Sequence, residues 1–387
     1  MGQAGHMAEV RADSLDVLRR RTSVKWTTHP ADVLPLFVAE MDYPLAAVVA
    51  QAIIDRVAAS DTGYVGSPAA LAPAFAGFAH RTWNWDVGPA GVLTTTDVSV
   101  AIVEVLRVAI APGDGVVITT PVYPPFFDLV PEAGGTVVEV PLLDDGTTWS
   151  LDLEGLERAF AAGATALLLC SPHNPLGLVH PRETLEAVAE LAARYGVTVV
   201  SDEIHGPLAH GHVPFMPYLS VSAAAAEHGV CVTSASKSWN LAGVKCAIMV
   251  TGSDRMSRLL ATMPAEVGFR TSILGLHASI AAFEHGGPWL NDAIAAITAS
   301  RDLLAALLAE HLPEVGFRPP AASFVAWLDF RALGWGDDPA ARALERAGVA
   351  LNPGLTFGAQ GRGHLRLNFA CSPEVLTDAI TRLAAAP

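Results

Sequence analysis

Residues 181–205 read PRETLEAVAELAARYGVTVVSDEIH, and this stretch joins a helix pattern directly to a strand pattern. Pro181 suits the first turn of a helix and Gly196 suits its end. Between them, apolar residues recur at helical spacing, at Leu185, Val188, Ala192 and Tyr195. The run at 197–201 is continuous and β-branched, which is typical of a strand covered on both faces. The stretch therefore predicts one helix–strand unit of an α/β fold.

Similar apolar runs lie on both sides of this unit, between about residues 92 and 250. We expect strands at Val116–Thr120, Thr136–Val140, Ala164–Cys170, Val230–Thr233 and Ala247–Val250. Helix-like segments alternate with these runs. The alternation predicts an α/β domain with a mostly parallel central sheet flanked by helices, and with ligand-binding loops at the carboxyl ends of the strands.

After about residue 270 the sequence changes to long Ala- and Leu-rich helical stretches followed by isolated strand candidates. We expect helices over Ile273–Phe283, Asp292–His311 and Ala340–Ala347, strands over Ser323–Phe330 and His364–Phe369, and a C-terminal helix. This mixture predicts a smaller α+β domain. We assign residues 45–270 to the large domain and 271–387 to the small one, which residues 1–44 are expected to join.

Composition excludes several classes of protein. Of the 387 residues, 51% are hydrophobic and 16% are charged, so the chain can bury a large core. The formal net charge of −15 repels nucleic-acid phosphates. No apolar run reaches the roughly 18 residues of a membrane span, and the N-terminus has no apolar signal segment. The four cysteines are scattered, as expected of buried thiols in a reducing cytoplasm.

A lysine motif, SASKSWNLAGVK, occupies residues 234–245, directly after the strand predicted at Val230–Thr233. A lysine at the end of a buried strand is costly unless it is neutralised, paired or used covalently. Burial and the second cation, Lys245, both lower the pKa of Lys237, as a Schiff-base lysine requires. The flanking serine hydroxyls suit a phosphate. Taken alone, the motif fits a surface lysine equally well.

Two further motifs place polar residues after predicted strands. Asp202 follows the strand at 197–201, and a fixed carboxylate there can keep the pyridine nitrogen of a cofactor protonated. Asn174 lies in SPHNPLG, a proline-bounded loop that can aim an amide donor at a ligand oxygen. Each also fits a structural role, Asp202 as a helix cap or turn residue and Asn174 in an Asn-Pro turn.

The running order N-P-x-G, S-D-E and S-x-S-K resembles fold type I enzymes that use pyridoxal 5′-phosphate (PLP), in the class I and II aminotransferase group. Segments spread over nearly the whole chain further resemble cystathionine β-lyases (C–S lyases) of the MalY/PatB type. They lie at 25–26, 32–36, 38–42, 62–64, 121–127, 169–175 and 201–205.

The resemblance implies roles for individual residues. Lys237 forms the Schiff base with the cofactor and moves the α-proton of the substrate. Asp202 pairs with the pyridinium nitrogen, and Asn174 bonds the phenolate oxygen of the cofactor. Tyr123 stacks on the pyridine ring. Arg366 holds the α-carboxylate of the substrate, a task that suits a bidentate guanidinium.

The resemblance also implies a phosphate site, to which Ser234 and Ser236 belong. Tyr64 resembles a tyrosine that reaches the phosphate from the neighbouring subunit, so a homodimer with shared active sites is expected. Tyr64 and Asp42 are also candidates for substrate binding.

A helix N-terminus at Asp97, Val98 and Ser99 is expected to complete the phosphate site through its backbone N–H groups. Many relatives have a glycine just before this helix. Here the Asp97 carboxylate must cap the helix or point away, because it would repel a phosphate. Lys245 is expected to contact the phosphate as a point charge.

These roles predict β-elimination from L-cystathionine or S-substituted L-cysteines, giving pyruvate, ammonia and a thiol. Transamination is the alternative, because it uses the same residues up to the carbanion. A non-enzymatic regulatory role is a weaker alternative, since a binding module needs no such set of residues.

Two other motifs do not indicate an additional activity or a metal site. Ser234–Lys237 also fits the S-x-x-K motif of penicillin-binding enzymes, but the K-T-G that this chemistry needs is absent. His205, His210 and His212 are not spaced as a known set of metal ligands, so no metal is expected.

Overall fold

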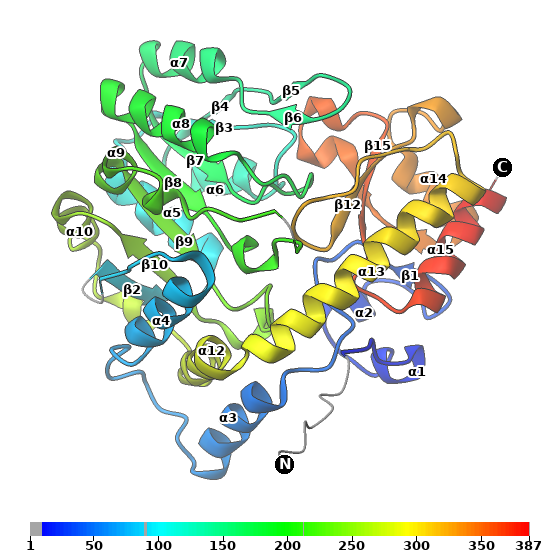
Figure 1. Ribbon diagram of the computed structural model, residues 1–387, viewed down its shortest axis with the longest axis horizontal. Helices are drawn as coiled ribbons and strands as arrows, with labels where there is room; N and C mark the ends of the chain where they lie inside the picture. The colour runs from blue at the N-terminus through cyan, green and yellow to red at the C-terminus, as the bar shows by residue number, and fades with distance from the viewer. Residues whose placement is uncertain (1–9, 89–90, 212, 387) are drawn as a thin grey trace, which may run out of the picture.

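The computed structural model describes residues 10–88, 91–211 and 213–386, and its centre is a sheet with helices on both faces (Figure 1). In the described residues this sheet has seven strands. They are β2 (Val92–Thr95), β3 (Gly115–Ile118), β4 (Thr136–Glu139), β7 (Ala164–Cys170), β8 (Thr198–Asp202), β9 (Gly229–Thr233) and β10 (Ala247–Thr251). Their order across the sheet is β2-β10-β9-β8-β7-β3-β4.

The sheet is mostly parallel, as predicted. The pairs from β4 through β3, β7 and β8 to β9 are all parallel, whereas β10 is antiparallel to both β9 and β2. The predicted strands agree with the observed ones to within two residues at each end. β2 is not among the predicted strands, because its run VLTT is short and half polar.

Helices cover both faces of the sheet. They are α4 (Leu71–Trp83), α5 (Val98–Ala109), α6 (Phe126–Glu132), α7 (Leu153–Ala161), α8 (Arg182–Tyr195), α9 (Ala223–His228), α10 (Asp254–Leu260), α11 (Glu266–Phe269) and α12 (Ile273–His285). A further helix, α3 (Ala47–Ala58), packs against α12. Alternate strand residues enter different cores: Val199 packs in one apolar cluster and Val200 in the other. The continuous apolar runs are therefore explained by burial on two sides.

A second sheet is built from the C-terminal part of the chain. Its strands are β11 (Gly316–Phe317), β12 (Val325–Asp329), β14 (Asn352–Pro353) and β15 (His364–Asn368), and its order is β11-β12-β15-β14 with antiparallel pairs. The accompanying helices are α13 (Gly287–His311), α14 (Pro339–Ala347) and α15 (Pro373–Ala385). The helix predicted at Ile273–Phe283 is α12, which packs with α4 of the central layer. The other helices and strands predicted after residue 270 are present, and α13 begins five residues before the predicted start at Asp292.

The N-terminal segment lies against the C-terminal part of the chain (Figure 1). After α1 (Leu15–Leu18) and α2 (Val24–Thr27), strand β1 (Leu34–Pro35) pairs in parallel with β13 (Val349–Ala350). The side chain of Asn368 then donates 2.7 Å hydrogen bonds to the carbonyls of Val38 and Glu40. Residues just after β1 are thereby fixed beside β15.

A small two-stranded sheet is separate from the two larger ones. Strands β5 (Leu143–Asp144) and β6 (Trp149–Ser150) form a hairpin between β4 and α7. Within the described ranges, no helix combines the length and apolar character that crossing a bilayer requires.

Candidate active site

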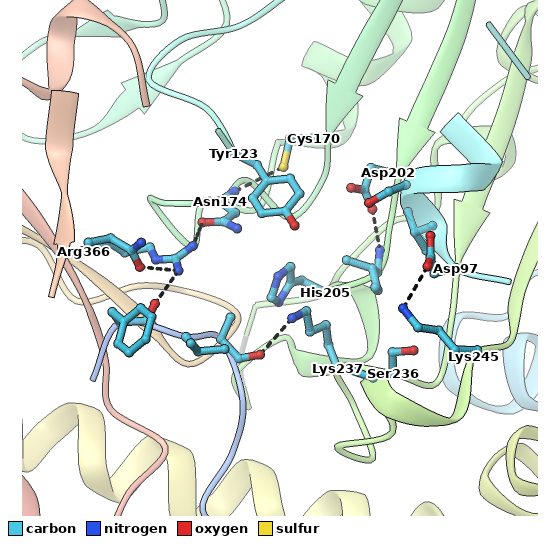
Figure 2. Close-up of a pocket in the computed structure, with 18 residues that line it drawn as sticks. Asp97, Tyr123, Cys170, Asn174, Asp202, His205, Ser236, Lys237, Lys245 and Arg366 are labelled. Atoms are coloured by element: carbon cyan, nitrogen blue, oxygen red, sulfur yellow. Dashed lines mark hydrogen bonds and ion pairs between the residues drawn. The ribbon is translucent and has the colours of Figure 1, made fainter. Parts of the chain in front are cut away.

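A cavity of about 340 Å³ lies at the carboxyl ends of the central strands (Figure 2). Three loops or strand ends of the sheet bring Asn174, Asp202 and Lys237 to it, and β15 brings Arg366. The predicted site residues that line this cavity are Asp97, Val98, Ser99, Tyr123, Asn174, Asp202, Ser236, Lys237, Lys245 and Arg366. Residues far apart in the sequence therefore meet in one place.

Lys237 is distinguished from the other two lysines of the chain by its partners. Lys25 pairs with the Asp42 carboxylate at 2.5 Å, and Lys245 pairs with Asp97 at 3.0 Å. In the described structure Lys237 has no carboxylate partner, and its Nζ donates to the Ala39 carbonyl at 2.8 Å. Desolvation, followed by the nearby Arg366, lowers the pKa of Lys237 to about 8. Its amine is therefore readily available in the neutral, nucleophilic form.

Asp202 is the last residue of β8, and its side chain faces the cavity (Figure 2). Its Oδ1 accepts a hydrogen bond from the Ile204 N–H at 3.2 Å. Desolvation raises the pKa of this carboxyl to about 7, because no cation is paired with it in the described structure. The adjacent Glu203 accepts instead from Ser201 and from the Tyr218 N–H. Only Asp202 of this acidic pair can meet a ligand.

Arg366 projects from β15 and is held by neutral acceptors. Its Nη1 donates to Asn174 Oδ1 at 3.0 Å, and its Nη2 donates to Asn352 Oδ1 at 2.7 Å and to the Phe37 carbonyl at 2.9 Å. The guanidinium also lies over the ring of Phe357. Burial lowers its pKa to about 10, so it stays charged at neutral pH. With no carboxylate paired to it in the described residues, it favours an anionic ligand.

Tyr123 forms part of the cavity wall beside Asn174 (Figure 2). Its ring packs edge-on against Phe126 with 5.9 Å between centroids. Burial raises the pKa of the phenol, so the ring is neutral and presents a flat surface to a ligand.

The amino end of α5 borders the cavity and carries both signs of charge. Asp97 caps the helix, since its Oδ1 accepts from the Val100 N–H at 3.0 Å, and its Oδ2 pairs with Lys245. The capping geometry agrees with the sequence prediction for Asp97. Lys245 has a left-handed backbone with φ of 61°. The free N–H groups and dipole of α5 and the charge of Lys245 together suit an anion.

Three predicted site residues do not line the cavity. Asp42 is fully buried against Lys25, which leaves no face for a substrate, so the structure places it behind the wall of the cavity. The Ser234 hydroxyl is also buried and bonds the Cys246 carbonyl at 2.6 Å and Ser236 Oγ at 2.7 Å. Tyr64 is 91% exposed and lies outside the cavity of its own chain.

The cavity also contains residues that were not predicted. Phe37–Ala39 and Asn352 contribute carbonyls, an amide and apolar surface, and Cys170 lies at the end of β7. A signal for Val38 and Ala39, but not for Phe37, was present in the segment at 38–42. Asn352, in a short turn, gave none.

The three histidines noted in the sequence are not gathered at one site. His205 lines the cavity, whereas His210 bonds the carbonyls of Pro320 and Ser323. His212 lies outside the described residues. Across the described part of the chain, no three His, Cys, Asp or Glu side chains cluster as metal ligands.

Comparison with known proteins identifies relatives along the whole chain. Residues 31–383 match the family model described as aminotransferase class I and II. A Mycobacterium tuberculosis protein named "Putative cystathionine beta-lyase" is 43% identical, with 96% of each chain covered. Cystathionine beta-lyase PatB of Bacillus subtilis is 34% identical, over 94% of this chain and 96% of PatB.

The fold has a counterpart among solved structures. The crystal structure of a Corynebacterium diphtheriae protein, called a "putative plp-dependent beta-cystathionase", superposes with a TM-score of 0.92. The two sequences are 34% identical, and the match covers 97% of this chain and 98% of the other.

Proposed function

Because the chain belongs to the class I and II aminotransferase family, we propose that it is a PLP-dependent carbon–sulfur β-lyase. Its substrates are L-cystathionine or S-substituted L-cysteines, which with water give pyruvate, ammonia and a thiol. One observation carries the proposal: a lysine and an arginine without carboxylate partners in the described residues share one cavity with a buried carboxylate, in a chain similar along its length to cystathionine beta-lyases.

The donor set of the cavity fits PLP. Among the described residues no cation is paired with the buried Asp202 carboxylate, and a protonated pyridine nitrogen supplies one. The amino end of α5, with Lys245 and Ser236, offers N–H groups, a cation and a hydroxyl for a phosphate. Lys237 offers an amine with a lowered pKa to an aldehyde. Tyr123 provides a flat wall on which a ring can stack.

When bound, PLP supplies an aldehyde that condenses with amines and a ring that delocalises negative charge. Lys237 then acts as the base that takes the proton from the substrate α-carbon, and the thiolate leaves from the β-carbon. Its lowered pKa suits this task, because a base operates best when its pKa lies near the working pH.

Arg366 and Asn174 orient the substrate. When the substrate carboxylate binds Arg366, the substrate α-carbon is held at a fixed distance from β15. The hydrogen bond between Arg366 and Asn174 fixes this position relative to the loop after β7. The carbonyls of Phe37 and Ala39 hold Arg366 and Lys237 from the same side of the cavity. Proton transfer therefore occurs within a preorganised frame.

The proposal includes a homodimer in which Tyr64 completes the phosphate site of the partner. This is supported by the exposure of the Tyr64 side chain, which has no ligand-facing position in its own chain. Coexpressing Lys237→Ala and Tyr64→Phe chains tests it. Heterodimers would contain one intact site, so activity should recover above that of either variant alone. Simple averaging of the two variants' activities would contradict a shared site.

The function is tested by incubating the PLP-loaded protein with L-cystathionine and no keto acid. Pyruvate and free thiol should appear in equal amounts over many turnovers. S-methyl-L-cysteine serves as a second substrate with a small leaving group. If turnover instead requires an added keto acid, the lyase proposal fails and the protein is an aminotransferase.

A further inference from the structure

The wall of the cavity at residues 37–41 is held through its backbone, because every carbonyl of this segment accepts a hydrogen bond from a side chain. In order from Phe37 to Met41, the donors are Arg366, then Asn368, then Lys237, then Asn368 again with Lys25, and finally Asn240 with a longer contact from Arg21. Arg366 and Lys237 have tasks in the proposed reaction. The mechanism above gives the other donors none.

Asn240 is the one of these other donors that lies nearest in sequence to the reacting lysine. It follows Lys237 by three residues, in the loop after β9. The Met41 N–H donates to Asn240 Oδ1 at 3.0 Å, and Asn240 Nδ2 donates to the Met41 carbonyl at 2.9 Å. Because both backbone groups of Met41 are bonded, this end of the wall is fixed relative to the loop that carries Lys237.

The backbone of Asn240 has a conformation that residues with a side chain rarely adopt. Its φ is 58°, in the left-handed region, where glycine is unstrained and asparagine is the best tolerated of the other residues. A glycine at this position would form the same turn without the two bonds to Met41. Replacement by glycine therefore separates the contribution of the side chain from that of the turn.

The Ala39 carbonyl is the acceptor for the free amine of Lys237 (Figure 2). The methyl group of Ala39 cannot anchor it, so the place of this carbonyl depends on its neighbours, which Asn368 holds on one side and Asn240 on the other. Lys237 can occupy this acceptor only while its amine is free, which in the proposed reaction is when it acts as the base. An N–H directed at the carbonyl orients the nitrogen, and the carbonyl stabilises the ammonium that forms when the proton is taken.

We propose that Asn240 is a positioning residue for proton transfer, because it fixes the wall segment so that the Ala39 carbonyl receives and orients the amine of Lys237. The inference rests on the proposed function. It requires only that an α-proton is removed, so it holds equally for a lyase and for an aminotransferase. A misplacement of about 1 Å between reacting groups costs about a hundredfold in rate. Asn368 still holds the segment when Asn240 is replaced, so we expect a smaller effect, of about tenfold.

The same segment predicts which kinetic constant changes. Arg366, assigned to the substrate carboxylate, lies on β15, and Asn368 fixes the segment from that same strand. Asn240 holds the other end, from the loop of the base. Its replacement should therefore impair proton removal and leave substrate binding nearly unchanged, so kcat falls and KM does not. A residue that only stabilised the fold would not separate the two constants.

The experiment compares wild type with Asn240→Gly, and thermal unfolding checks that the variant folds as wild type does. In the cofactor-free proteins, hydrogen exchange of peptides that contain Met41 should be about tenfold faster in the variant. In the PLP-loaded proteins, kcat for L-cystathionine should fall about tenfold while KM stays within about twofold. The α-deuterium isotope effect on kcat should rise, and exchange of the substrate α-proton with D₂O should slow by the same factor as kcat.

The matched control is Asn84→Gly, which replaces an exposed asparagine that has a similar left-handed backbone, with φ of 52°, at the end of α4. It should leave hydrogen exchange at Met41, kcat and the isotope effect unchanged. An unchanged kcat in Asn240→Gly, or a fall in kcat without a rise in the isotope effect, would overturn the role of Asn240. If PLP-loaded wild type exchanges no α-proton of L-cystathionine or S-methyl-L-cysteine, the proposed function itself fails.

Discussion

Arg366 Nη1 donates a 3.0 Å hydrogen bond to Asn174 Oδ1, so the C-terminal sheet and the loop after β7 are joined across the cavity. The bond links a residue assigned to the substrate with one assigned to the cofactor. Replacing Arg366 by Lys keeps the charge but loses the planar fork. We expect KM for L-cystathionine to rise about ten- to a hundredfold, as for the loss of one or two charge-assisted bonds. Arg318→Lys, outside the cavity, should leave KM unchanged.

Lys237 is one of only three lysines, and the other two are engaged in ion pairs. Borohydride reduction of the PLP-loaded protein, followed by peptide mass spectrometry, should therefore find the cofactor on Lys237 alone. Lys237→Ala should lower turnover about 10²- to 10⁴-fold through loss of the base. Label on Lys245, or full turnover by the alanine variant, would refute the assignment.

Because Asp97 and Lys245 form an ion pair, we expect replacement of the two residues to change the affinity for PLP in opposite directions. Lys245→Met leaves the Asp97 carboxylate uncompensated beside the phosphate site, so the dissociation constant of PLP should rise about tenfold. Asp97→Asn keeps an N-cap but removes the negative charge, so binding should tighten. Equilibrium dialysis measures both. Weaker binding by the asparagine variant would show that the carboxylate does more than cap α5.

Asp202 should make the stability of the cofactor-free protein depend on pH. The folded protein keeps this proton up to about pH 7, whereas the ordinary pKa is 3.8. Between these values the unfolded chain binds fewer protons, so stability falls as pH rises. Asp202→Asn removes this titration. The free energy of unfolding of the variant, relative to that of wild type, should therefore increase across this window by on the order of 4 kcal/mol. Urea unfolding at pH 4.5 and 8 tests this, and added PLP should diminish the slope in wild type.

Lys25 and Asp42 form a fully buried ion pair behind the cavity wall. Lys25→Met should destabilise the fold by about 3–5 kcal/mol, because it strands the carboxylate. The double variant Lys25→Met/Asp42→Leu should cost less than the single one. Replacing Arg56 of the exposed Arg56–Asp61 pair by Met serves as the control and should cost about 1 kcal/mol or less. Additive losses in the double variant would contradict this account.

The sequence predicts those parts of the fold whose burial pattern is local. The α8–β8 unit and β7 follow from periodicity and from Gly and Pro at their ends, and β7 was predicted at its observed bounds. The reversed direction of β10 was not predictable, because an apolar run reads the same in either direction.

The site residues also fall into those that the sequence predicts and those that it does not. Asp202 ends the buried strand β8 and Lys237 follows the buried strand β9, so both were recognisable by position and chemistry. The Phe37 carbonyl and Asn352 were not, because a backbone oxygen has no residue signature and Arg366 reaches Phe37 across 329 positions of sequence. Asp42 was predicted to bind the substrate, but it is buried against Lys25. A segment that resembles a family does not reveal which of its side chains faces the cavity.

The pairing of β1 with β13 has a consequence for synthesis of the protein. A ribosome releases the N-terminal residues first, yet the wall they form at Phe37–Ala39 needs strands that are translated some 300 residues later. The nascent chain can thus build most of the central sheet while the site still lacks its wall and its arginine. A complete site can therefore form only after β13 and β15 have been translated.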